Sequence, residues 1–190
     1  MRRTVTGFVL GYHGCDKSVA EQLLAGAPFE FSTNNYDWLG AGAYFWENDP
    51  LRAMRWAEKL KGRPSKSGKT ITEPAIVGAV IDLGLCLDLT TQPSLDVIRT
   101  AYDGLAKLHD IAKETLPKNV DELRRPLDCA VLNYLYESMP EPKFQTVRGM
   151  FVEGGELYPG AFIQRETHVQ IAVRDLSCIQ GVFRPSITAP

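Results

Sequence analysis

Two short stretches decide the fold: Tyr12-His13-Gly14, which closes an apolar run, and Gly40-Ala41-Gly42-Ala43-Tyr44-Phe45, which leads into an aromatic one. The first predicts a strand over residues 6–13, because Phe8-Val9-Leu10 is continuously apolar. The second predicts a short strand over residues 43–46, since aromatic residues favour strands. Each stretch alone has an ordinary explanation, a histidine at a strand end or a tight glycine turn. Because no helix follows the two glycines directly, a Rossmann dinucleotide site is disfavoured.

The rest of the chain predicts strand-rich ends around a helical middle. Ser18 with Glu21 has the spacing of a capping box and predicts a short helix that ends at Gly26. Asn48-Asp49-Pro50 predicts the start of a helix that runs to about Leu60. Further strands are expected over 75–83, 146–152, 168–173 and 181–183, and two helices over 95–114 and 123–137. This order predicts an α+β fold in a single domain, residues 1–190.

Composition narrows the classes of protein. The chain has 190 residues, is 44% hydrophobic and carries a net charge of −2, so it is no polycation. Its apolar runs are shorter than the ~20 residues that span a bilayer. The four cysteines are scattered without a CxxC pair, which disfavours zinc and predicts reduced, buried thiols in the cytoplasm. They are Cys15, Cys86, Cys129 and Cys178.

Together, the two stretches resemble the ADP-ribosyltransferases of the diphtheria-toxin and poly(ADP-ribose) polymerase branch. In that family the first strand ends in a Tyr-His-Gly-type motif, and a later strand is entered by Gly-x-Gly-Ile-Tyr-Phe. A helix with a small residue near its start follows, here Ala53, and residues 76–84 are similar to the family's next strand. The resemblance spans about residues 7–90 and 146–184. The helical middle, about residues 93–140, has no counterpart and is interpreted as an insertion.

The resemblance implies two small antiparallel sheets packed around an NAD cleft, and no metal. It implies that the backbone of Gly14 pairs with the nicotinamide carboxamide and that His13 binds a ribose hydroxyl of the adenosine. Tyr44 would stack on the nicotinamide ring, because an electron-rich face suits a cationic pyridinium. Glycine allows close approach of a ligand to the backbone. The NAD contacts expected on this basis are Tyr12, His13, Gly14, Asn34, Tyr36, Gly42, Tyr44 and Trp56.

The third catalytic position departs from the family. Classical members place a glutamate on the late strand, and the pattern of Val173 and Asp175 puts Gln170 at that position. A glutamine can bond the ribose 2′-hydroxyl, but it cannot act as a base. Glu166 shares a face of the predicted strand with Gln170 and is the alternative third residue. A set of His13, Tyr44 and Gln170 predicts transfer of a single ADP-ribose rather than chain elongation.

Three further positions have two interpretations each. Family members often carry a serine and a second stacking tyrosine on the helix after Tyr44, where this chain has Arg52 and Arg55. Trp56 either supplies the other side of the ring sandwich or packs the helix on the core. Asn34 and Tyr36 either contact NAD from the loop that crosses the cleft or belong to the loop structure itself.

A basic run follows the second motif. Seven of the residues between 52 and 69 are basic, and one is acidic. The run is either a solvated helix face and loop or a phosphate-binding patch for an RNA or DNA acceptor. The basic residues are Arg52, Arg55, Lys59, Lys61, Arg63, Lys66 and Lys69.

The expected function is transfer of one ADP-ribose from NAD to a macromolecular acceptor, a protein or a nucleic acid. The alternatives are an NAD glycohydrolase and a catalytically inactive module that binds NAD or ADP-ribose. The resemblance also suggests a bacterial toxin or phage-defence effector, for which an antitoxin would be a partner. No membrane partner is expected.

Overall fold

The computed structural model describes residues 7–64, 68–121 and 124–186. Thr6, Lys66 and Leu123, which belong to the predicted elements or to the basic run, lie outside the described residues. The elements of the described residues are β1 (Phe8–Asp16), α1 (Lys17–Leu24), β2 (Ala43–Glu47), α2 (Pro50–Leu60), β3 (Pro74–Asp82), β4 (Cys86–Asp88), α3 (Gln92–Ala112), α4 (Pro126–Ser138), β5 (Thr146–Phe151), β6 (His168–Val173), a 3-10 turn (Leu176–Cys178) and β7 (Ile179–Phe183).

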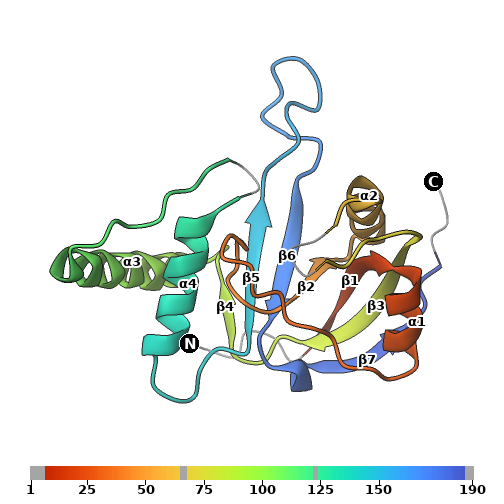
Figure 1. Cartoon of the computed structure of the whole chain (residues 1–190), viewed down its shortest axis with the longest axis horizontal. Helices are drawn as coiled ribbons and strands as arrows, with labels where there is room; N and C mark the ends of the chain where they lie inside the picture. The colour runs from red at the N-terminus through yellow and green to blue at the C-terminus, as the bar shows by residue number, and fades with distance from the viewer. Residues whose placement is uncertain (1–6, 65–67, 122–123, 187–190) are drawn as a thin grey trace.

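The strands form one mixed sheet in the order β4-β5-β6-β2-β1-β3-β7 (Figure 1). The α+β class is therefore confirmed, whereas the two packed sheets expected from the resemblance are not confirmed, because the strands of the described residues form a single sheet. The two halves are joined because β2 pairs with both β6 and β1. The joint is narrow: β1 and β2 share two residue pairs, against nine between β1 and β3.

Helices cover both faces of the sheet. Phe45 of β2 packs in the cluster that includes α1, while its neighbours Tyr44 and Trp46 pack on the opposite face. On that opposite face α2 lies over β1 and β3, and the α3–α4 pair lies over the β4–β5–β6 half. The helical middle is thus packed on the same sheet as the two motifs.

Strand β4 was not predicted from the sequence. It has three residues, too few for an alternating pattern, and it pairs parallel to β5. All four cysteines are buried and free, as predicted. In the described part of the chain, no helix combines the length and the apolar character that crossing a bilayer requires.

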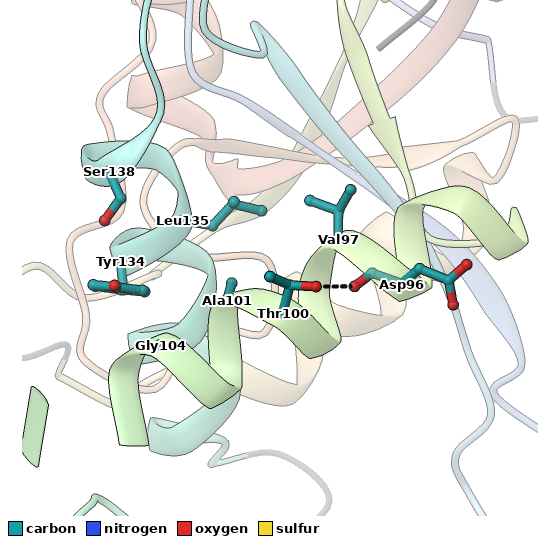
Figure 2. A pocket seen from close by; sticks show the side chains of 8 residues that line it. All are labelled: Asp96, Val97, Thr100, Ala101, Gly104, Tyr134, Leu135 and Ser138. Atoms are coloured by element: carbon teal, nitrogen blue, oxygen red, sulfur yellow. Dashed lines mark hydrogen bonds between the residues drawn. The ribbon is translucent and has the colours of Figure 1, made fainter. Parts of the chain in front are cut away.

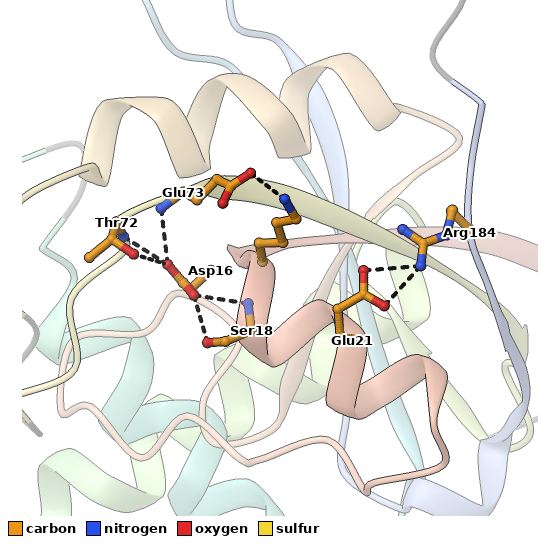
Figure 3. A network of polar contacts seen from close by, with 7 residues as sticks. Asp16, Ser18, Glu21, Thr72, Glu73 and Arg184 are labelled. Atoms are coloured by element: carbon orange, nitrogen blue, oxygen red, sulfur yellow. Dashed lines mark hydrogen bonds and ion pairs between the residues drawn. The ribbon is translucent and has the colours of Figure 1, made fainter.

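The start of α1 differs from the prediction. Asp16, not Ser18, caps the helix, because β1 continues to Asp16 and the chain turns directly into α1. The Asp16 carboxylate accepts hydrogen bonds from the backbone N–H and the hydroxyl of Ser18, and from the same two groups of Thr72 (Figure 3). It also accepts one from the backbone N–H of Glu73. Glu21, expected in a capping box, pairs with Arg184 instead. Asp16 therefore ties α1 to the segment that enters β3.

These hydrogen bonds make Asp16 a source of acid sensitivity. They hold the pKa of its carboxyl well below the usual value of 3.8, with the Ser18 hydroxyl as the largest cause. The stabilisation is complete above that usual value and is lost as the pH falls toward the folded-state pKa. We expect Asp16→Asn to lower the melting temperature at neutral pH, and the gap to the wild type to narrow below about pH 4. A gap that stays constant down to pH 3 would contradict this, and Glu21→Gln, in an exposed ion pair, is the control expected to show little change.

Candidate functional site

The ladder between β1 and β2, the strands that carry the two motifs, ends at the point where the motifs come together. Their ladder pairs Gly11 with Glu47 and Tyr12 with Trp46. In an antiparallel strand every second residue directs its backbone N–H and C=O toward the same neighbouring strand. The Leu10 carbonyl accepts from the backbone of Asn48, so after Tyr12 the next residue of β1 whose backbone faces β2 is Gly14. In place of a Gly14–Tyr44 pair, the Tyr44 carbonyl accepts a hydrogen bond from Nδ1 of His13 at 2.9 Å. The motifs are thus in direct contact at a break between β1 and β2.

The bond to Tyr44 fixes the state of His13. A carbonyl oxygen only accepts, so Nδ1 carries the proton. Burial lowers the pKa of the imidazole, although the bond to Tyr44 opposes this. The neutral ring therefore presents Nε2 as an acceptor. The ring lies 5.6 Å from that of Phe29 and 5.9 Å from that of Phe45, between centroids.

Gly14 lets α2 lie directly on the sheet beside the break. A Cβ at this position would fall 2.3 Å from the carbonyl oxygen of Ala53. Ala53, the small residue near the start of the helix, is itself fully buried. Gly42, just before β2, allows a close approach to β6, since a Cβ there would lie 3.0 Å from the carbonyl oxygen of Val173. Any larger residue at Gly14 would push α2 away from β1.

The side chain of Tyr44 holds the loop that enters β2. Its hydroxyl donates to the carbonyl of Gly40 at 2.6 Å and accepts from the backbone of Leu39 at 3.0 Å. Burial raises the pKa of this hydroxyl well above its usual value, so it stays protonated. Gly40 has φ of 74°, a left-handed conformation that favours glycine. Asn133 of α4 secures the same loop by accepting from the backbone of Ala41 at 3.0 Å.

Gln170 stands on the strand next to Tyr44. It lies opposite Trp46 of β2, which in turn lies opposite Tyr12 of β1. Opposed residues of antiparallel strands point to the same face, so these three side chains share one side of the sheet. Tyr44 is two residues from Trp46 and is therefore a diagonal neighbour of Gln170, a position that separates two residues on adjacent strands by about 7–8 Å.

The three predicted catalytic residues surround the break without sharing one face. The ring of His13 lies with Phe29 and Phe45 on the side of α1. Tyr44 and Gln170 point to the other side. Their link is the backbone of Tyr44, which β2 presents to His13.

The other expected NAD contacts are engaged in packing. Asn34 donates from its amide to the Ser32 hydroxyl at 2.9 Å. The backbone carbonyl of Asn34 accepts from the Cys129 thiol, and the backbone carbonyl of Tyr36 accepts from the backbone N–H of Arg125. These bonds favour the structural interpretation of the loop, which lies against the start of α4.

The aromatic candidates on β1 and α2 cluster around Trp46. The Trp56 ring lies 5.3 Å from that of Trp46, and Tyr12 packs with both in a small cluster under α2. Tyr12 also meets the edge of Phe183 at 6.2 Å. Helix packing is therefore an established role of Trp56, and both side chains remain partly exposed.

A buried ion-pair cluster beside the site was not predicted from the sequence. Arg52 of α2 is 7% exposed, and its Nη2 bonds Glu153 at 2.5 Å and Glu166 at 3.2 Å. His168 Nδ1 lies 3.6 Å from the same Glu153 carboxylate. The cluster fastens α2 to both ends of the β5–β6 connection, residues 152–167, which extends beyond the sheet (Figure 1). Glu166, the alternative third residue, thus precedes β6 and is turned toward α2.

The same cluster corrects the interpretation of the basic run. Arg52 is buried in ion pairs and cannot contact a nucleic acid from the surface. Lys69 pairs with Glu30 at 2.5 Å, and Lys59 lies 4.0 Å from Glu166. Arg55, Lys61 and Arg63 are exposed and form what is left of the patch among the described residues.

Two hollows in the described surface lie away from the break. The larger, about 490 Å³, runs between α3 and α4 (Figure 2). The smaller, about 320 Å³, is lined by residues that include Gly84, Gln145 and Cys178. Neither is lined by His13, Tyr44 or Gln170.

Comparison with known proteins adds no assignment. Neither a scan of protein-family models nor a search of curated protein sequences returned a match to this chain. The function is therefore inferred from the residues of the site and their geometry.

Proposed function

We propose that this protein is a mono-ADP-ribosyltransferase, which cleaves NAD and transfers ADP-ribose to a macromolecular acceptor. The observation that carries the proposal is the hydrogen bond between His13 and the Tyr44 carbonyl at the break between β1 and β2. Two motifs 31 residues apart in sequence thereby meet at one point, with Gln170 on the adjoining strand.

The geometry supports a division of roles at the break. The backbone of Gly14 faces the break and can pair with a carboxamide, which needs one donor and one acceptor. The free Nε2 of neutral His13 can accept from a ribose hydroxyl. Tyr44 offers an aromatic face, and the Gln170 amide can bond the ribose 2′-hydroxyl as positive charge develops on the sugar.

The reaction exchanges one bond at the anomeric carbon of the nicotinamide ribose. The bond from C1′ to the pyridinium nitrogen breaks, and its electron pair leaves with neutral nicotinamide. The acceptor forms the new bond to C1′ and releases a proton to solvent. Because Gln170 cannot take that proton, the protein would make a single transfer, onto an acceptor that is nucleophilic by itself.

The missing carboxylate at residue 170 favours one second candidate, a module that binds NAD without cleaving it. NAD hydrolysis, with water as the acceptor, is the third outcome that the same chemistry allows. The four buried free cysteines suit a reducing compartment such as the cytoplasm, where NAD is present.

Binding of NAD at the break is tested by its effect on thermal stability. We expect NAD to raise the melting temperature of the wild type, since a ligand at 100 times its Kd stabilises by about 2.7 kcal/mol. His13→Ala should lose most of this shift, because it removes both the imidazole and its bond to Tyr44. His109→Ala in α3 is the matched control and should keep the shift. Equal shifts for the two variants would refute binding at the break.

A further inference from the structure

One side of α4 lies along the loop that leads into β2, residues 34–41 (Figure 1). Three residues at this side are spaced by four positions, which stacks them along the helix. Each of the three makes a hydrogen bond to the backbone of the loop, at 3.0 to 3.4 Å. They are Arg125, at the start of the helix, Cys129 and Asn133. The helical insertion therefore supports the loop of the second motif.

Asn133 makes the bond nearest to the second motif. Its Oδ1 accepts from the backbone N–H of Ala41 at 3.0 Å and also from Nη2 of Arg174. Its Nδ2 donates to the Cys129 sulfur at 3.4 Å. Since both Ala41 and Arg174 present donors, the oxygen of the amide must face them. Asn133 thus joins the loop to the residue that follows β6.

The guanidinium of Arg174 depends on the same oxygen. Its central carbon lies 4.4 Å from the ring centroid of Tyr136 and 5.4 Å from that of Phe144. Burial lowers its pKa, and its Nε has no hydrogen-bond partner among the described residues. A buried charged group without an acceptor is costly, so Oδ1 of Asn133 is important for both of its donors.

The loop is packed closely against Asn133 and is tied to Tyr44. A Cβ at Gly40 would lie 2.7 Å from Oδ1 of Asn133 and would also collide with Arg174. The carbonyl of Gly40 accepts from the Tyr44 hydroxyl at 2.6 Å. A loop that moved away from α4 would therefore carry the Tyr44 ring with it. The contacts run from Asn133 through the loop to Tyr44.

We propose that Asn133 is a positioning residue for NAD: it holds the loop of residues 34–41, and through the loop the ring of Tyr44, in the arrangement that receives the nicotinamide. This inference rests on the proposed function. It gives the helical insertion a role in NAD binding, although the insertion lies outside both motifs. The effect is on affinity, because bound NAD itself holds the loop. A loop in place for about one tenth of the time would weaken apparent binding about tenfold.

Substitutions of Asn133 separate positioning from stability. Asn133→Leu removes the oxygen at similar volume, and we expect KM for NAD to rise about tenfold while kcat stays within about twofold. Asn133→Asp keeps an oxygen for Ala41 and Arg174, so KM should stay close to that of the wild type. Leu105→Ala removes buried packing of α3 on the insertion without touching the loop. It should lower the melting temperature and leave KM unchanged. Release of nicotinamide at varied NAD concentration measures both constants.

Hydrogen exchange at the Ala41 amide, measured by NMR, reports on the loop without NAD. We expect faster exchange in Asn133→Leu than in the wild type or Asn133→Asp. Unchanged exchange, unchanged KM, or an equal rise of KM in Leu105→Ala would overturn the positioning role. A wild type that neither binds nor cleaves NAD would refute the proposed function and the role in NAD binding, whereas the exchange rates would still show whether α4 holds the loop. Asn133→Ala, which leaves room for water beside Arg174, replaces Asn133→Leu if that variant does not fold.

Discussion

Arg52→Met is expected to lower the free energy of unfolding by about 3–5 kcal/mol. The guanidinium is buried and neutralises Glu153, which is 4% exposed. Removing one partner of a buried pair leaves the other charge without compensation, which costs more than the pair contributes. Chemical denaturation followed by circular dichroism measures the change. The β5–β6 connection should also become more sensitive to proteolysis, because Arg52 fastens both of its ends to α2.

Two further variants separate this mechanism from simple loss of packing. Arg52→Met/Glu153→Gln removes both charges and should recover most of the lost stability. Arg55→Met makes the same substitution at an exposed arginine of the same helix, and it should change the free energy of unfolding by less than about 0.5 kcal/mol. A loss below about 1 kcal/mol for Arg52→Met would show that the cluster does not hold α2 in place.

Gln170→Ala is expected to lower kcat for release of nicotinamide by roughly 100- to 1,000-fold. In the proposed reaction the Gln170 amide bonds the ribose hydroxyl as charge develops, and alanine has no such group. Gln170→Glu keeps an acceptor at the same position and adds negative charge, so it should retain more activity than Gln170→Ala. Release of nicotinamide is followed by liquid chromatography.

The neighbouring alternatives supply the controls for this prediction. Gln180→Ala replaces an exposed glutamine of the edge strand β7 and should leave turnover unchanged. Glu166→Gln should reduce turnover less than Gln170→Ala, because the Glu166 carboxylate is hydrogen-bonded to Arg52 of α2 and does not point toward Gln170. A larger loss for Glu166→Gln would move the third catalytic role from Gln170 to Glu166.

Local patterns in the sequence were sufficient for most of the elements. The prediction for β6 matches its bounds, and the helix at Asp49-Pro50 begins as expected, with Asp49 capping it. Local patterns failed where a short segment depends on a distant partner. Strand β4 exists because it pairs with β5, about 60 residues later. Asp16, which caps α1, also accepts hydrogen bonds from Thr72, 56 residues later in the chain.

The site shows the same division between local and distant information. The sequence identified His13 and Tyr44 as candidates, but the bond between them depends on how far the β1–β2 ladder extends. Arg52 appeared to belong to a surface patch, since its partners Glu153 and Glu166 are about 100 residues away. A signal was present: the other inward positions of α2, Ala53 and Ala57, are apolar, and an arginine beside them needs a buried partner.

The most direct test of the proposed function is the fate of NAD labelled in its adenosine half, incubated with the purified protein and a whole-cell lysate. We expect the label to become attached to macromolecules, protease or nuclease to remove it, and nicotinamide to be released in equal amount. The label should stay in NAD when Gln170→Ala replaces the wild type. Label that appears only as free ADP-ribose would indicate a hydrolase, and intact NAD with the wild-type protein would contradict the proposed reaction.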